Sequence, residues 1–282
     1  MANYGTVSQQ DAPTQNGNAH PADEETAALL GGKTQGSNSN SIGRRFRRHM
    51  TNNVSNAWGD LALLFCYIIT GLLDSCSVFI WGSFLSMQTG NTIYLGLGVV
   101  APYESNRWLR SGISIASFCF GSFFFARYHR YFGGRKRWVL VSSYILQLSM
   151  IIAAALMVTL GPRTGTSGPV TVFIGLPIAL IAFQSAGQAV TSRVLSYSTM
   201  TGVVLTSIYC DLFSDPKLFS PPTANDERNR RIAAPILLFI GACFGGLWAH
   251  SETGLAGALW TAAVLKLFVI IAWCCWSAEK EA

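Results

Sequence analysis

The chain has 282 residues, of which 50% are hydrophobic and only 12% are charged, and its formal net charge is +6. This composition is typical of membrane proteins and excludes a soluble domain with a charged surface. The positive charge lies mainly in blocks that flank apolar runs, so it fits orientation in a lipid bilayer, and we expect no nucleic-acid partner.

Residues 1–43 are rich in Asn, Gln, Ser, Thr and Gly and show no apolar periodicity, which predicts a disordered cytosolic tail. Within this tail, Glu25, Leu29 and Leu30 have the spacing of an acidic dileucine motif, the sorting signal that clathrin adaptors read. A chance pattern is the alternative. The motif predicts a vacuolar or endosomal membrane if it is used, and the plasma membrane otherwise. Residues 44–57 form a basic juxtamembrane segment.

The predicted membrane domain covers residues 58–276 and holds eight apolar runs. Most of them approach the roughly 20 residues that a helix needs to cross the hydrocarbon core of a bilayer. Because the runs show no polar face at helical period, they do not indicate a soluble helical bundle. The runs lie near 60–81, 86–101, 109–127, 138–160, 170–190, 198–213, 233–249 and 255–276.

Three blocks of basic residues determine the predicted topology, because Lys and Arg tend to stay on the cytosolic side. If all eight runs crossed the membrane, the second block would lie outside. All three blocks lie inside if 86–101 and 198–213 are short, broken or re-entrant helices. We therefore expect six net crossings, cytosolic termini and a short C-terminal segment at 277–282. The blocks are Arg44, Arg45, Arg47 and Arg48; then Arg127, Arg130, Arg135, Lys136 and Arg137; then Arg228, Arg230 and Arg231.

The two halves of the membrane domain, 58–160 and 170–276, have matching hydropathy and are interpreted as an internal repeat. With three crossings each, the repeats would be inverted. Inverted repeats with interrupted helices in equivalent positions indicate a transporter-type site near the bilayer midplane. A duplication kept only for packing is the alternative. Aligning the halves places Thr89 and Gly90 on Thr201 and Gly202.

Polar residues in the first half mark the first candidate site. Asp74 lies about two-thirds along the first run, where an unpaired carboxylate would cost about 2.5–3.5 kcal/mol. It is a candidate for binding a cation or relaying protons, and a structural cap or a buried ion pair is the alternative. Thr89, Gly90 and Asn91 offer a hydroxyl, a flexible backbone and an amide. These groups suit either a substrate or the cap of a half-helix.

The second half adds a basic residue and two amides. Lys266 lies near the middle of the last run and is expected to face the protein interior. We interpret it as a salt-bridge partner of Asp74 or as a positive group on an anion path. Gln184 and Gln188 share one helix face, where they contact substrate or only join helices. Arg193, at the end of the same run, completes the candidate substrate or ion site together with Thr201 and Gly202.

Seven cysteines lie nearly all within apolar runs and lack metal-type spacing, so we expect them to pack as small hydrophobes and predict no metal site. Cys274 and Cys275 lie at the cytosolic end of the last run and are palmitoylation candidates. Gly241, Gly245 and Gly246 predict a surface for close helix packing.

Four segments of the chain form a recognisable set: Gly71-Leu-Leu-Asp-Ser, Met87-Gln-Thr-Gly-Asn-Thr, Ala186-Gly-Gln and Thr201-Gly. They resemble the DUF1275 (YoaK-like) family of membrane proteins. The resemblance covers roughly residues 58–276 and implies an integral membrane protein without an assigned biochemical role. This chain departs from the family pattern in the second half, where Ala189 follows the Gln and Val203 follows the second Thr-Gly. The tail before the membrane domain resembles that of a fungal-type member.

The sequence thus favours an all-α polytopic membrane protein that transports a small solute or an ion. The alternative is a scaffold or regulator whose buried polar groups only hold helices together. No nucleophile elbow, His-Glu-x-x-His zinc motif, phosphate loop or dinucleotide fingerprint appears in the sequence, so we expect neither an enzyme nor a cofactor.

Overall fold

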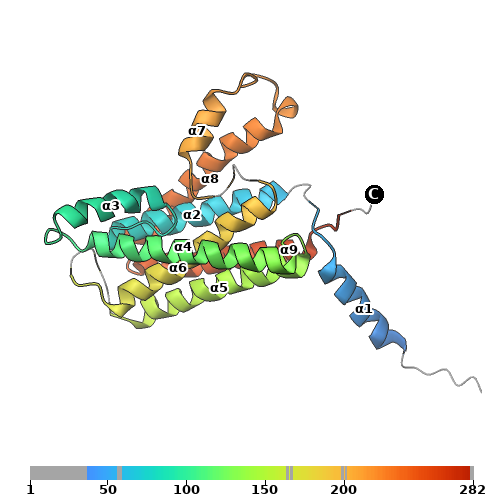
Figure 1. The fold of residues 1–282 in the computed structure, drawn as a ribbon, viewed down its shortest axis with the longest axis horizontal. Helices are drawn as coiled ribbons and strands as arrows, with labels where there is room; N and C mark the ends of the chain where they lie inside the picture. Colours follow the sequence, from blue (N-terminus) through green and yellow to red (C-terminus); the bar gives the residue numbers. More distant parts are fainter. Residues whose placement is uncertain are drawn as a thin grey trace, which may run out of the picture. The chain divides into compact units, whose positions relative to one another are not determined.

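The computed structural model describes residues 37–55, 59–162, 165, 168–197, 200 and 202–279, and side chains from residue 43 onward. Within these ranges the chain is helical and has no strand (Figure 1). Several sequence predictions fall outside the described residues: most of the tail, the sorting motif at Glu25, Leu29 and Leu30, the hydroxyl of Thr201, and the last three residues.

Six of the described helices are long and apolar enough to cross a membrane, as the basic blocks predicted. Two short helices, α3 and α7, lie where the interrupted runs were expected, so the multi-pass all-α fold is confirmed. The long helices are α2 (Gly59–Trp81), α4 (Arg107–Phe132), α5 (Arg137–Leu160), α6 (Val172–Val194), α8 (Asp226–Ala249) and α9 (Gly254–Cys275). The others are α1 (Ser37–Thr51), α3 (Gln88–Val100), α7 (Thr206–Phe213) and the 3-10 turn η1 (Pro222–Ala224).

Helix α1 begins at Ser37, several residues before the basic segment that was predicted from residue 44. Ile42, Phe46 and Met50 recur every fourth residue along it, which is the spacing of one helical face. The Arg residues between them occupy the rest of the helix surface. The helical signal was therefore present in the sequence, but it was short and embedded in polar residues.

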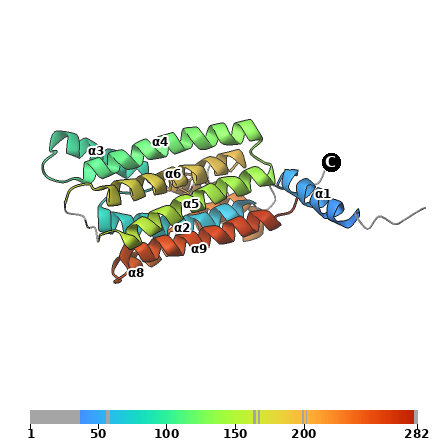
Figure 2. The same ribbon diagram turned by 90° about the horizontal axis from the view of Figure 1, so that it is seen from below.

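The two halves of the membrane domain repeat the same order of elements: a long helix, a break, a short helix and two long helices. This order matches α2 with α6, α4 with α8 and α5 with α9. The packing follows the repeat, because the most extensive contact, between α2 and α8, corresponds to the contact between α6 and α4. Helix α5 packs on its own equivalent, α9 (Figures 1 and 2). Each half has three long helices. Equivalent helices therefore run in opposite directions, which is the arrangement of an inverted repeat.

Glycines allow α2 and α8 to approach closely. A Cβ atom added to Gly71 would lie 2.1 Å from the backbone oxygen of Leu238, and one added to Gly241 would lie 2.1 Å from that of Ile68. Gly245 makes a similar approach to α2. The predicted small-residue surface is therefore real for Gly241 and Gly245, whereas Gly246 has no neighbour within 4 Å of an added Cβ.

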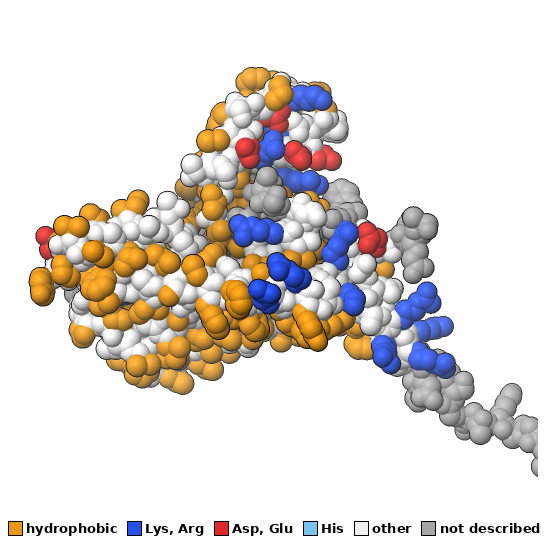
Figure 3. All heavy atoms as spheres, in the orientation of Figure 1, with side chains coloured by type: hydrophobic (Ala, Val, Ile, Leu, Met, Phe, Trp, Pro, Cys, Tyr) orange, Lys and Arg blue, Asp and Glu red, His pale blue; other side chains and the backbone are white. Residues whose placement is uncertain are grey.

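The second and third basic blocks lie at the same end of the helix bundle. Arg137 donates hydrogen bonds to the backbone oxygens of His49 and Trp276, and so ties α5 to the segments before α2 and after α9. Arg230 forms an ion pair with Asp60 at 2.6 Å, at the start of α2. On the face that Figure 3 shows, hydrophobic side chains cover much of the bundle at the left of the view, and the Lys and Arg side chains lie toward the right.

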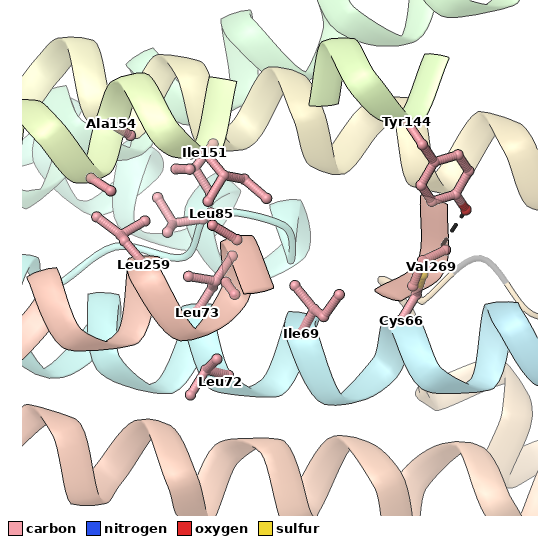
Figure 4. Packing of buried hydrophobic residues seen from close by; sticks show 14 of the residues in the cluster. Cys66, Ile69, Leu72, Leu73, Leu85, Tyr144, Ile151, Ala154, Leu259 and Val269 are labelled. Carbon is pink, nitrogen blue, oxygen red and sulfur yellow. Dashed lines mark hydrogen bonds between the residues drawn. The ribbon is translucent and has the colours of Figure 1, made fainter. Parts of the chain in front are cut away.

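The apolar core lies mainly between α2, α5 and α9 (Figure 4). Leu73 on α2, Ile151 on α5 and Leu259 on α9 meet there and are buried. Leu85 joins them although it belongs to the break between α2 and α3, and its side chain is fully buried. The break therefore enters the protein interior, which positions the first candidate site.

Candidate functional site

The first break begins where α2 ends at Trp81. Gly82 has a φ of +74°, a left-handed conformation that glycine adopts without steric cost. Two arginines of α4 hold this end: the Arg110 guanidinium donates to the oxygen of Trp81 at 2.7 Å, and Arg107 Nε donates to the oxygen of Gly82 at 2.9 Å. Cations at the end of a helix satisfy carbonyl groups that have no partner within the helix.

The Asp74 carboxylate binds the segment that turns back after this end. Its Oδ1 accepts from the backbone N–H groups of Leu85 at 2.7 Å and Ser86 at 2.9 Å, and its Oδ2 accepts from the Ser86 hydroxyl. Among the described residues, no Lys or Arg lies within 4 Å of this carboxylate. The geometry is that of a structural cap, one of the two alternatives that the sequence left open.

Asn91 secures the same segment from the start of α3. Its Oδ1 accepts from the N–H of Phe84 at 2.9 Å, and its Nδ2 donates to the oxygen of Phe84 at 2.8 Å and to the Ser114 hydroxyl at 3.0 Å. Thr89 is exposed, and Gly90 leaves room for the Phe84 ring, which would lie 2.5 Å from an added Cβ. The first break is thus held largely by contacts within the protein.

Lys266 occupies a different environment. Its side chain is fully buried, although it lies at the middle of α9. The Nζ atom donates to Gln188 Oε1 at 2.9 Å and lies 4.9 Å from the centroid of the Tyr144 ring. No carboxylate of the described residues lies within ion-pair distance of it. The salt bridge between Lys266 and Asp74, one reading of the sequence, is therefore not formed.

Gln188 links Lys266 to α2. Its Nε2 donates to the Thr70 hydroxyl at 3.0 Å and to the backbone oxygen of Cys66 at 3.3 Å. The second break, which lies between α6 and α7, reaches this amide, because a Cβ added to Gly202 would lie only 2.9 Å from Gln188 Nε2. Gly202 has a φ of +75°, so the close approach and the backbone conformation both require glycine.

Tyr67 completes the surroundings of the second break. Its side chain is fully buried, and its hydroxyl faces the backbone of Gly202 without forming a hydrogen bond within standard distance. A buried hydroxyl without a partner is costly and calls for an explanation. We call the group of Tyr67, Thr70, Gln188, Gly202 and Lys266 the lysine cluster.

The other residues that the sequence predicted in the second half do not belong to this cluster. Gln184 is buried one turn before Gln188, where its amide nitrogen donates to the Ser185 hydroxyl at 3.0 Å. Arg193 is exposed in the last turn of α6. Cys274 is half-buried and Cys275 exposed at the end of α9, which leaves both palmitoylation predictions open.

Sequence reasoning missed Tyr67, Thr70 and Tyr144. Thr70 lies four residues before Asp74 and three after Tyr67, so the three residues share one face of α2. That spacing was a usable signal. Tyr144 could not have been found in this way, because only the packing of α5 on α9 brings its ring to Lys266.

A cavity of about 190 Å³ lies at the basic end of the bundle and leads toward the second break. Its lining includes Arg230 from α8, together with Tyr197 and Met200 from the break between α6 and α7, and Met200 stands two residues before Gly202. Burial raises the pKa of the Tyr197 phenol, and the nearby Asp60 carboxylate adds to the rise, so the phenol stays protonated at neutral pH.

Comparison with known proteins gives one match. The sequence model of a family described as "Protein of unknown function (DUF1275)" matches residues 62–272. This range contains both breaks and the whole lysine cluster. No curated protein and no solved structure matches the chain.

Proposed function

The chain belongs to the DUF1275 family, and we propose that this multi-pass membrane protein moves a small solute or an ion across its membrane through the lysine cluster. The observation that supports this function is the Lys266 ammonium group, which is buried at the middle of a spanning helix without a carboxylate partner in the described chain. An ionisable residue inside a membrane protein is a functional-site candidate by default.

Stability alone does not account for Lys266. A charged residue at the centre of a spanning helix costs about 2.5–3.5 kcal/mol on insertion scales, and well-packed apolar residues often replace buried charges without loss of stability. The α9 segment around Lys266 is otherwise apolar, so Met or Leu would suit the position better. A binding role explains why a lysine stands there.

The packing of the long helices suggests which parts move. The strongest contacts, between α2 and α8 and between α4 and α6, join the two halves, so rocking of one half against the other would break the core. The short elements have fewer contacts: α7 packs only lightly on α8. We propose that movement of the second break around Gly202 opens the lysine cluster toward the 190 Å³ cavity.

The positive-inside rule assigns the basic end of the bundle, with both chain ends, to the cytosol. In this orientation the cavity opens to the cytosol. Recognition of the tail by clathrin adaptors at Glu25, Leu29 and Leu30 belongs to the same proposal and would favour a vacuolar or endosomal membrane. The plasma membrane is expected if the motif is not used.

One observation favours a non-transporting scaffold or regulator instead. The buried carboxylate of Asp74 is fully engaged by Leu85 and Ser86, so the most specific part of the first half needs no ligand to explain it. If Lys266 also served only to join helices, its loss would change stability and no transport would be found.

Flux measurements on purified protein in liposomes distinguish the two functions. We expect the wild type to carry current or radiolabelled flux for at least one member of a panel of small anions, cations and neutral solutes. Lys266→Met should abolish that flux, and Lys217→Met, which changes an exposed lysine outside the cluster, should retain it. Absence of flux for every solute, or equal flux through Lys266→Met, would favour the scaffold.

A further inference from the structure

The environment of Lys266 also indicates which kind of solute the cluster takes. We propose that the solute is a small monovalent anion, bound by the Lys266 ammonium group beside Gly202. This inference rests on the proposed function and names its substrate class. Three features of the lysine cluster support it: its charge, its hydrogen-bond donors and its size.

The charge of the cluster is a single positive group. Helix α2, which carries Tyr67 and Thr70 of the cluster, also carries two carboxylates, and both are engaged elsewhere. Asp60 forms an ion pair with Arg230, and Asp74 accepts hydrogen bonds from backbone N–H groups of the first break. A lysine ammonium has three N–H donors, and among the described residues Lys266 directs one hydrogen bond, to Gln188 Oε1. A monovalent anion would neutralise this one charge and use the remaining donors.

The Gln188 amide beside Lys266 is fully engaged. Its Nε2 donates to the Thr70 hydroxyl and to the Cys66 backbone oxygen, and the Tyr67 hydroxyl on the same helix forms no hydrogen bond among the described residues. The carbonyl oxygen of the Gln188 amide, which a cation would need, already accepts from Lys266. An anion therefore meets a positive charge with unused ammonium donors, whereas a cation meets a like charge and an amide oxygen that is already occupied.

The space at the second break limits the size of the anion. A Cβ added to Gly202 would lie 2.9 Å from Gln188 Nε2, so even a methyl group at that point would displace the Gln188 amide from its present position. The 190 Å³ cavity beyond Met200 offers room outside the cluster. An anion with few heavy atoms can pass the Gly202 backbone after a modest movement, and a larger one would require α2 and α6 to separate.

Binding is tested first, with detergent-purified protein in a chloride-free gluconate buffer of constant ionic strength. The probes are formate, acetate, nitrate and chloride, with acetamide as the neutral match of acetate and methylammonium as a small cation. Ligands that bind the native state raise its melting temperature in a saturable manner. We expect at least one of the four anions, and neither acetamide nor methylammonium, to do so in the wild type.

Variants connect that response to the cluster. Lys266→Met should weaken the saturable response at least about tenfold, while Lys217→Met should keep the wild-type response. Gln188→Glu offers a second route if Lys266→Met does not fold. It places an internal carboxylate where Gln188 Oε1 now lies 2.9 Å from Lys266 Nζ, so it should remove the anion response by competition.

Flux of the same probes into liposomes separates this inference from the proposed function. An anion that binds through Lys266 and is also transported supports both. Binding that depends on Lys266 without flux supports the anion site and overturns transport. Flux of methylammonium or acetamide, unaffected by Lys266→Met, overturns the anion site and supports transport elsewhere in the protein. No response to any probe in either assay overturns both.

Discussion

Asp74 and Lys266 are charged residues in the interior of the same membrane domain, but their surroundings assign them different roles. Among the described residues, the Asp74 carboxylate receives three hydrogen bonds from Leu85 and Ser86, whereas the Lys266 ammonium group donates one hydrogen bond and lies near an aromatic ring. The sequence alone could identify both residues from their position in apolar runs. It could not show that they do not meet, because pairing between helices depends on how those helices pack.

Replacing Asp74 by Asn tests the capping role. The amide keeps one acceptor for the N–H groups of Leu85 and Ser86 but loses the charge and one oxygen, so we expect a loss of about 1–3 kcal/mol in stability. Thermal unfolding followed by intrinsic fluorescence should show a melting temperature several degrees lower. The response to anions should persist. An unchanged melting temperature with loss of the anion response would instead place the ligand at Asp74.

At the scale of elements, the crossing of α2 and α8 depends on glycines that the sequence already indicated. The three glycines in the second half of α8 were predicted as one surface, but periodicity could not show which of them face α2. In the structure, Gly241 and Gly245 lie at the crossing, whereas Gly246 faces open space. The two breaks were also predictable, because their apolar runs were short and full crossings would have misplaced a basic block.

Gly241→Val and Gly246→Val form a matched pair for this crossing. At position 241 the new side chain would meet the backbone of Ile68, which cannot yield without separating the helices. We expect Gly241→Val to prevent recovery of monodisperse protein in size-exclusion chromatography. Gly246→Val, with open space around it, should behave like the wild type. Equal behaviour of the two variants would contradict the packing of α2 on α8.

The connection between α7 and α8 should respond to acid through Asp215. This carboxylate accepts from the backbone N–H of Lys217 at 2.8 Å and the side chain of Asn225 at 3.0 Å, which lower its pKa below the ordinary value. Because the folded pKa is lowered, its stabilising effect is complete above the unfolded pKa of about 3.9 and is lost as pH falls through the folded value.

Limited proteolysis measures that effect in the connection. We expect the wild-type segment to resist cleavage at neutral pH and to become susceptible only under acid conditions, and an acid-active protease allows the comparison. Asp215→Asn should be cleaved readily at neutral pH as well. Asp211→Asn, which changes a carboxylate that makes none of these contacts, serves as the control. If Asp215→Asn resists cleavage like the wild type, Asp215 does not hold this connection.

At the scale of the whole molecule, the arrangement of basic residues fixes an expected orientation. Arg137 gathers the segment before α2, the start of α5 and the end of α9 at one end of the bundle. By the positive-inside rule this end is expected to face the cytosol. The sequence predicted that the second and third basic blocks share a side. The structure places them at the same end of the bundle, because Arg230 forms an ion pair with Asp60 at the start of α2.

Cysteine labelling in intact cells checks the orientation. In a background with Cys210 and Cys275 changed to Ser, we expect Glu104→Cys, in the connection before α4, to react with a membrane-impermeant maleimide if the protein lies in the plasma membrane. Lys217→Cys should react only after the membrane is permeabilised. For a vacuolar or endosomal protein, sealed organelles replace cells and the pattern reverses. A pattern opposite to the one expected for the compartment would invert the assigned topology.

The interlocking of the two halves also has a consequence for synthesis of the protein. The face of α2 that contains Gly71 has no packing partner until α8 has been synthesised. In the same way, α4 lacks its main packing partner until α6 has been synthesised. A ribosome that has released only the first three spanning helices has therefore inserted a chain with no core of its own. Final packing must follow insertion of the last two helices, so chains truncated before α8 should be recognised and degraded by membrane quality control.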